Sequence, residues 1–141
     1  MLSKDVQTAQ AWAEKLHQDQ VDKSGKPYIG HPARVAGRLE SLEAQAVGWL
    51  HDTVEDTGLS LMEVEKEFGP ETAVAVDAVS RRSGEDWDSY LLRVKQNPIA
   101  RQVKISDLID NSNLTRLEKV TIKDVERQAK YNRALKFLMS E

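Results

Sequence analysis

Apolar residues recur at intervals of three and four along almost the whole chain, and this spacing is the strongest constraint on its fold. Near the start, for example, Val6, Ala9, Trp12, Ala13 and Leu16 would all lie on one face of a helix. Clean two-residue alternation of β-branched residues, the pattern of a half-buried strand, is absent. We therefore predict an all-α protein, folded as a compact helical bundle with almost no sheet.

Proline, glycine and capping residues mark where these helices begin and end. Ser60 and Glu63 form a capping-box pattern at the start of one helix. The Gly-Pro pair at 69–70 and the Asn-Pro pair at 97–98 interrupt the helical pattern, because proline restricts the residue before it. Pro32 suits the first turn of a helix, since its missing N–H would be unpaired there. The predicted helices span residues 3–18, 32–42, 44–56, 60–68, 71–80, 87–96, 98–113 and 121–139.

The composition is that of an ordinary single-domain protein. A chain of 141 residues, 40% hydrophobic and 30% charged, is long enough to bury a core, and no repeat or second domain is visible, so we predict one domain over residues 1–141. No apolar run approaches the roughly 20 residues that cross a bilayer, and the start lacks the apolar centre of a secretory signal. We expect a cytoplasmic protein with no membrane partner.

The charge of the chain does not favour a nucleic-acid partner. The formal net charge is −3, whereas binding to a phosphate backbone needs a concentrated positive face. Residues 119–136 hold several basic side chains, but acids are interspersed among them at helical spacing. A solvated helix face is therefore the favoured interpretation of this segment, and a functional patch is the alternative.

The segment 49–56 holds the densest group of ionisable residues. Residues three and four apart share one face of a continuous helix, so His51 would neighbour Glu55. Asp52 would neighbour both Glu55 and Asp56. Apolar neighbours indicate that this helix is buried, where ionised carboxylates are costly unless they are paired or bind a cation. A divalent metal would resolve this conflict. The alternative is an exposed acidic edge at the end of the helix. We favour the metal, because the helix dipole disfavours acids at a helix C-terminus.

Metal binding is left to carboxylates and to three histidines, because the chain has no cysteine. His31 lies in a rigid entry to the helix predicted to start at Pro32, which would fix the direction of its imidazole. Taken alone, His31 would more readily be a helix cap or a satisfied core residue. His17, near the end of an exposed amphipathic helix, is interpreted as a structural or surface residue with no role in a site.

A second ionisable group lies in the segment 103–111. Lys104, Asp107 and Asn111 follow three- and four-residue spacing and would line one face of a helix, with Asp110 near it. The alternative is a structural ion pair between Asp107 and Lys104, which is worth little if exposed.

Taken together, His31, the pair His51-Asp52 and Asp107 resemble in order and spacing the H…HD…D pattern of the HD phosphohydrolase superfamily. The resemblance implies an HD-type helical bundle in which these four residues bind one metal ion. Two imidazoles and two carboxylates suit Mn²⁺, Fe²⁺, Co²⁺ or Zn²⁺ better than Mg²⁺ or Ca²⁺.

Three longer segments are similar to the hydrolase domain of RelA/SpoT-type proteins. They are DKSGKPYIGHP at 22–32, HDTVEDT at 51–57 and VKISDLIDN at 103–111, and the likeness covers about residues 4–138. It implies hydrolysis of the 3′-pyrophosphate of (p)ppGpp to GDP or GTP plus pyrophosphate, usually with Mn²⁺. Because 141 residues leave no room for synthetase or regulatory domains, the small alarmone hydrolases and the metazoan SpoT homologue are the nearest match.

The resemblance also implies roles for individual residues. His31, His51, Asp52 and Asp107 would be the metal ligands. Glu55 and Asp56 would orient or deprotonate the attacking water. Substrate contacts are implied for Lys23 and Ser24 with the base, Asn111 with the ribose or a phosphate, Lys104 with the diphosphate, and Tyr131 on the last helix. Ordinary surface polarity is the alternative for these substrate-contact residues.

Two positions depart from the long RelA/SpoT enzymes. Asp22 stands where many of them carry arginine against the guanine, and Leu114 stands in place of a common threonine, so the base preference is left open. The acid at position 22 motivates the hypothesis of a shift toward adenine-containing alarmones such as ppApp. Two rival functions share most of these features. One is another HD-type enzyme, such as an NADPH phosphatase or a nucleotide 5′-phosphatase, and the other is a catalytically weak alarmone-binding module.

Overall fold

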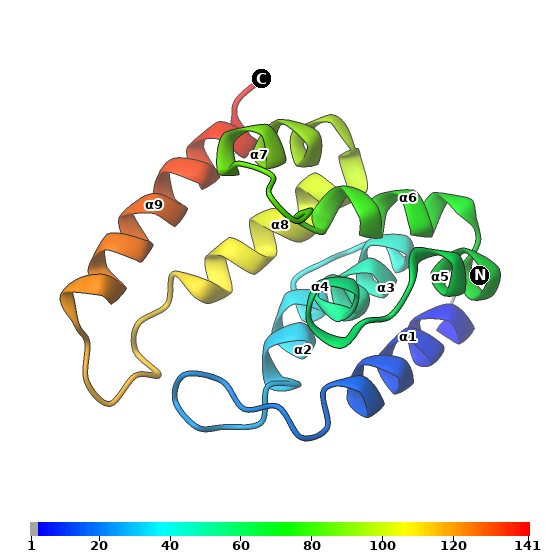
Figure 1. Ribbon diagram of the computed structural model, residues 1–141, viewed down its shortest axis with the longest axis horizontal. Coiled ribbons are helices and arrows are strands. Elements are labelled where there is room, and N and C mark those ends of the chain that lie inside the picture. Colours follow the sequence, from blue (N-terminus) through cyan, green and yellow to red (C-terminus); the bar gives the residue numbers. More distant parts are fainter. Residues whose placement is uncertain (1–2) are drawn as a thin grey trace.

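Helix α8 lies at the centre of the structure. The computed structural model describes residues 3–141, and Figure 1 shows α8 between the N-terminal helices on one side and α7 and α9 on the other. Helix α8 packs against α2, α3, α6, α7 and α9, while α1 packs on α3 and α5 on α6. The helices of this part of the chain are α1 (Ser3–Leu16), α2 (Gly30–Gly37), α3 (Leu42–Leu50), α4 (Thr53–Thr57), α5 (Leu61–Phe68), α6 (Pro70–Val79), α7 (Trp87–Gln96), α8 (Pro98–Asn111) and α9 (Ile122–Met139).

The all-α prediction is confirmed. Among the residues that the structure describes, the only β-type pairing is an isolated bridge between Val21 and Pro27. Helix α7 has the predicted bounds, and α5 begins with the predicted capping box, in which the Ser60 hydroxyl accepts from the Glu63 N–H at 3.1 Å. Between residues 3 and 141, no helix is both long enough and apolar enough to cross a membrane.

Helix α2 begins and ends earlier than the predicted range 32–42. It begins at Gly30 because the Ala33 N–H already bonds to the carbonyl of Ile29, the residue before the helix, at 3.1 Å. It ends at Gly37, after which Ser41 caps α3 by accepting from a backbone N–H. His31 therefore lies inside the first turn of a helix, and the backbone fixes the direction of its side chain.

The prediction of one continuous helix over 44–56 is wrong, because a turn at His51 separates α3 from α4. The His51 ring donates to the Gly48 carbonyl at 2.7 Å, and the Thr53 hydroxyl donates to the Leu50 carbonyl at 2.7 Å. These side chains satisfy carbonyl groups at the end of α3, where a helix runs out of its own N–H donors.

The break changes the setting of the two acids that follow it. Glu55 and Asp56 lie in the first turn of α4 rather than at the end of a long helix. The first turn is where the helix dipole favours acids. Their sequence position therefore gives no support to a functional role, and that role depends on their surroundings.

The core lies between α8 and the helices on either side of it. The buried apolar residues of α8 are Ala100, Val103 and Leu108. Helices α2 and α3 cross closely at Gly48, where an added Cβ would lie 3.1 Å from the Ala36 Cα. This close approach brings the turn that follows α3 next to the start of α2.

Gly48→Ala should therefore lower the free energy of unfolding by about 1–3 kcal/mol, because overpacking at a backbone contact has no flexible side chain to absorb it. Urea unfolding would measure the loss. Gly37→Ala is the matched control, since no atom lies within 4 Å of a Cβ at that position. Equal losses in the two variants would contradict this account of the α2–α3 contact.

Candidate functional site

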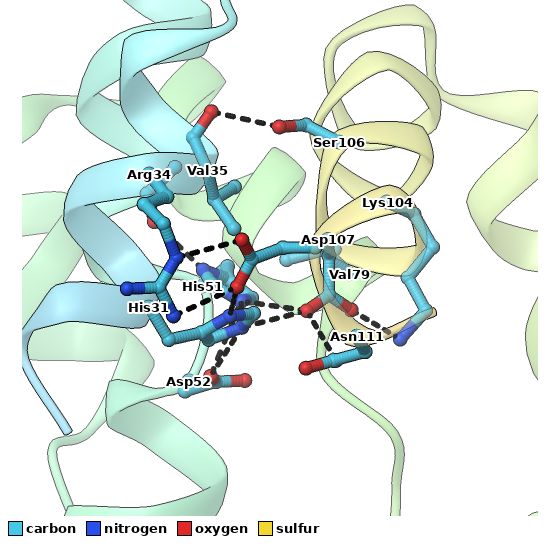
Figure 2. A network of polar contacts seen from close by, with 12 residues as sticks. His31, Arg34, Val35, His51, Asp52, Val79, Lys104, Ser106, Asp107 and Asn111 are labelled. Carbon is cyan, nitrogen blue, oxygen red and sulfur yellow. Dashed lines mark hydrogen bonds and ion pairs between the residues drawn. The ribbon is translucent and has the colours of Figure 1, made fainter. Parts of the chain in front are cut away.

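Four side chains from three segments of the chain converge beside α8. Figure 2 shows His31 from α2, His51 and Asp52 from the turn between α3 and α4, and Asp107 from α8. The Nε2 atom of His31 lies 2.8 Å from Asp107 Oδ1 and 3.3 Å from His51 Nε2. The Nε2 atom of His51 lies 3.3 Å from Asp107 Oδ1 and 3.2 Å from Asp52 Oδ2. The structure thus brings together all four residues predicted as metal ligands.

The spacing of these atoms suits a divalent metal ion. Ligand atoms about 2.1 Å from one ion lie about 3 Å apart when they occupy neighbouring positions. The distances from ring nitrogen to carboxylate oxygen here run from 2.8 to 3.7 Å. The ligand atoms of His31, His51 and Asp52 all lie within 4.8 Å of one another, and Asp107 contacts both rings. Two imidazoles and two carboxylates are a donor set for transition metals.

Both imidazoles are held through Nδ1, which leaves Nε2 of each ring facing the cluster. The Nδ1 atom of His51 donates to the Gly48 carbonyl, because a carbonyl only accepts. The Nδ1 atom of His31 lies 2.7 Å from Asp110 Oδ2. A proton on Nδ1 leaves the lone pair on Nε2, and an imidazole binds a metal through such a lone pair.

Asp110 is completely buried and connects His31 to three arginines. Arg34 donates to its carboxylate at 2.7 and 3.1 Å, and the guanidinium groups of Arg38 and Arg116 lie 3.3 and 3.4 Å away. Burial alone would raise the pKa of Asp110, but His31 and Arg34 outweigh it and hold that pKa well below its usual range. The sequence placed Asp110 near the site without a role, because His31 and Arg34 lie 79 and 76 residues away along the chain.

The charges of the four candidate ligands and of Lys104 shift one another's pKa values. Burial by itself would lower the pKa of His31 and His51, but the surrounding carboxylates raise both. Burial opposes ionisation of Asp52 too, yet His51 lowers the pKa of that carboxyl to about 2. Lys104 keeps the pKa of Asp107 well below its usual range despite burial. Both carboxylates are therefore charged at neutral pH, the form that binds a cation.

Three polar residues orient the two aspartates. The Tyr28 hydroxyl donates to Asp52, and this contact escaped the sequence analysis although Tyr28 lies only three residues before His31. Lys104 Nζ donates to Asp107 Oδ2 at 2.8 Å, and Asn111 Nδ2 donates to Asp107 Oδ1 at 3.0 Å. Two of the five predicted substrate residues thus bind Asp107 directly. For Lys104 this is the ion pair that the sequence offered as an alternative, although it is largely buried rather than exposed.

Glu55 and Asp56 follow Asp52 closely along the chain, in the first turn of α4. Glu55 accepts a hydrogen bond from the backbone N–H of Arg81. Partial burial raises the pKa of both carboxyls, and the negative charge of Asp52 adds to the shift. A carboxylate with a raised pKa is a better proton acceptor near neutral pH.

A cavity of about 310 Å³ opens beside His31. Its lining residues come from the loop after α1, from α2, from the end of α8 and the loop that follows it, and from α9, and they include Arg34, Arg116 and Arg127. Of the predicted substrate residues, it is lined by Lys23, Ser24, Asn111 and Tyr131. Lys104 does not line this cavity.

Asp22 holds the loop that borders the cavity. Its Oδ1 atom accepts from the Ser24 N–H at 2.9 Å, from the Ser24 hydroxyl at 2.7 Å and from the Lys26 N–H at 3.0 Å. The hydroxyl of Ser24, predicted as a base contact, is therefore engaged within the loop. These contacts outweigh desolvation and lower the pKa of Asp22.

His17 lies just after α1 and is buried rather than exposed, with 1% of its surface accessible. Its Nδ1 lies 2.8 Å from Gln20 Oε1, and its ring packs against Tyr28 with the ring centres 4.9 Å apart. Of the two interpretations of His17, the structure supports the structural one. His17 is not among the residues that converge on the candidate metal site.

Several known proteins are similar to this chain in sequence. A family model described as HD domain matches residues 9–102. A probable guanosine-3′,5′-bis(diphosphate) 3′-pyrophosphohydrolase of Synechocystis is 48% identical over 82 residues, which are 55% of this chain and 11% of that protein. The guanosine-3′,5′-bis(diphosphate) 3′-pyrophosphohydrolase of Aquifex aeolicus is 31% identical over 121 residues, 77% of this chain and 17% of that protein. The chain thus spans less than a fifth of the length of these two relatives.

A solved structure shares the fold of this chain. It belongs to a metazoan orthologue of SpoT that is described as hydrolysing ppGpp. The TM-score is 0.80 at 20% sequence identity, and the match covers 96% of this chain and 86% of that one. At this level of identity the likeness concerns the arrangement of the helices.

Asp110→Asn should lower the free energy of unfolding by about 3 kcal/mol, because it breaks a buried ion pair. This value is at the low end of the range for such pairs, since the arginines reach solvent. Thermal unfolding would measure the loss. Asp77→Asn is the matched control, since its ion pair with Arg82 is exposed and is worth less than about 1 kcal/mol. Similar stability of the two variants would contradict the importance of the Asp110 contacts.

Proposed function

The chain belongs to the HD domain family, and on that premise we propose that it is a metal-dependent phosphohydrolase that removes the 3′-diphosphate of (p)ppGpp or a closely related nucleotide. The observation that carries the proposal is the convergence of His31, His51, Asp52 and Asp107 beside a cavity of nucleotide-binding size. The names of the two pyrophosphohydrolase relatives support the choice of substrate. Packing of α8 against helices from both halves of the chain supports one domain for this function.

The four converging residues are the proposed ligands of one divalent ion, and Mn²⁺ is the ion we favour. Such an ion supplies Lewis-acid polarisation of a phosphoryl oxygen and makes a nearby water more acidic. The chain's own part is to hold the donor atoms in place. Asp110 and the Gly48 carbonyl orient the two imidazoles, and Tyr28 orients Asp52.

The proposed reaction is hydrolysis of the bond between the 3′-oxygen and its phosphorus. The water oxygen bonds to that phosphorus, the P–O3′ bond breaks, and pyrophosphate leaves with the new oxygen. Glu55 or Asp56 accepts a proton from the water, and the 3′-oxygen departs as a hydroxyl after gaining a proton. The raised pKa values of the two carboxyls suit them to this exchange.

The cavity beside His31 is the proposed site of the nucleoside. Hydrogen bonds to the nucleoside are available from Lys23 and Asn111, and the ring of Tyr131 can pack against it. Asp22 is already bonded within its own loop, which argues against a direct part in choosing the base. Turnover of ppGpp compared with ppApp tests this point, and NADPH and a nucleotide 5′-monophosphate test the rival HD-type activities.

Incubation with ppGpp and Mn²⁺ should release pyrophosphate, and both chelation and Asp52→Asn should abolish that release, because each removes the ion. Coupled detection of pyrophosphate measures the rate. Asp19→Asn removes the same charge from an exposed position and serves as the control. Release that persists in Asp52→Asn, or that ignores the chelator, would count against the proposal.

Glu55→Gln should lower kcat by about 100- to 10,000-fold, because an amide cannot accept the proton that general-base catalysis removes. The affinity for Mn²⁺ should stay almost unchanged, since Glu55 is outside the four-residue cluster. Steady-state kinetics and calorimetric titration with Mn²⁺ separate the two effects. A parallel loss of metal affinity would instead make Glu55 a ligand.

A further inference from the structure

Three positively charged side chains gather around the ring of Trp87, the first residue of α7. The ammonium of Lys130 lies 4.1 Å from the ring centre, and the Lys104 ammonium and the Arg81 guanidinium each lie 5.6 Å from it. They come from α9, from α8 and from the segment after α6, so the fold assembles the group. Figure 1 shows α7 lying beside α9 at the end of the molecule opposite the loop after α1. We refer to Trp87, Arg81, Lys104 and Lys130 as the Trp87 cluster.

The Trp87 cluster carries more positive charge than its surroundings neutralise. Within residues 3–141, Lys104 has Asp107 as a partner, but no carboxylate oxygen lies within 4 Å of the charged groups of Arg81, Lys130 or the nearby Arg133. Burial lowers the pKa of Lys130, and the charges of Arg81, Lys104 and Arg133 lower it further. These like charges repel one another in the free protein, and a bound anion would relieve the repulsion.

Cation–π contacts do not explain the gathering. One contact of a cation with an aromatic ring is worth about 0.5–1 kcal/mol at an exposed site. Three cations that share one ring also repel one another, and that repulsion works against the gain. A cavity of about 490 Å³ lies beside the cluster, between α7 and α9, and its lining includes Trp87, Lys130 and Arg133 with one acid, Asp88. The cavity leaves room for an anion beside Lys130, and Arg81 and Lys104 are not among its lining residues.

The Trp87 cluster adjoins the proposed reaction site at three points. Lys104 donates to Asp107, one of the four proposed metal ligands. The backbone N–H of Arg81 donates to Glu55. The ring of Tyr131, which lines the nucleoside cavity, lies 6.2 Å from the ring of Trp87. A phosphate held by the cluster would therefore belong to the same substrate as the phosphorus at the ion.

The geometry points to an anion subsite at the Trp87 cluster that binds the outer phosphate of the diphosphate under attack. Arg81 and Lys130 form this subsite, and Lys104 borders it. This inference rests on the proposed function and deepens it, because it makes the enzyme selective for a diphosphate over a monophosphate. A phosphomonoester has no outer phosphate to fill the subsite. The same residues would hold pyrophosphate after the P–O3′ bond has broken.

Binding of inorganic pyrophosphate tests the subsite directly. Manganese-loaded protein is titrated with pyrophosphate by calorimetry, with inorganic phosphate as the comparison ligand. Pyrophosphate should bind wild-type protein more tightly than phosphate does. Arg81→Ala and Lys130→Ala should each weaken pyrophosphate about tenfold, the loss expected for one charged hydrogen bond.

Matched variants keep this test interpretable. Lys136→Ala removes the same charge from an exposed position on α9. A titration of Mn²⁺ with pyrophosphate without protein corrects for the heat of chelation. Arg81→Ala leaves the backbone N–H that binds Glu55 in place. If Lys130→Ala fails to fold, as judged by circular dichroism, Lys130→Gln retains most of the side chain and takes its place.

The outcomes separate this inference from the proposed function. Pyrophosphate binding that is absent, or that is equal in Lys130→Ala, Arg81→Ala and Lys136→Ala, overturns the subsite even if ppGpp is hydrolysed. If pyrophosphate binding is weakened by Arg81→Ala and Lys130→Ala but no nucleotide is hydrolysed, the subsite is supported and the proposed reaction is contradicted. If the subsite and the proposed reaction are both correct, Arg81→Ala and Lys130→Ala should also raise KM for ppGpp about tenfold, while kcat changes less.

Discussion

The buried carboxylate of Asp107, held between two imidazoles and the ammonium of Lys104, is the interaction on which the rest of the structure depends. Taking a carboxylate out of water costs several kcal/mol unless opposite charge surrounds it. His31, His51 and Lys104 can surround Asp107 only if α2, the turn after α3 and α8 meet at one point. The central place of α8 meets this requirement, because it packs against both α2 and α3.

Local patterns in the sequence predict most of the helices. Helix α7 has the predicted bounds because its capping residue and the proline that follows it act within a few residues. The break at His51 escaped prediction because apolar spacing continues across it. It arises from contacts of the His51 ring and the Thr53 hydroxyl with carbonyl groups. Such contacts compete with helical hydrogen bonds without altering the apolar pattern.

The candidate site likewise contains residues that the sequence predicts and residues that only the fold reveals. Its four proposed ligands were found from a motif, since residue type and order are visible in a sequence. Asp110 and Tyr28 were given no role, because what they do depends on His31 and Asp52, which are brought to them by folding. Burial of His17 was also missed, because the loop after α1 folds back over it. Motifs thus reveal the groups that do chemistry, while the groups that orient them emerge from packing.

The net charge of −3 and the positive side chains near the site both bear on the kind of anion that the proposed function requires. At distances beyond about 8–10 Å, salt screens individual charges, so a long polyanion meets a weakly acidic surface. Near His31 and Asp107, positive side chains gather around Asp110 and around the ring of Trp87. A small nucleotide with several phosphates can satisfy these local charges, whereas a nucleic acid would also have to approach the acidic remainder. The overall charge thus disfavours a nucleic acid, while the local charge fits the small nucleotide proposed as the substrate.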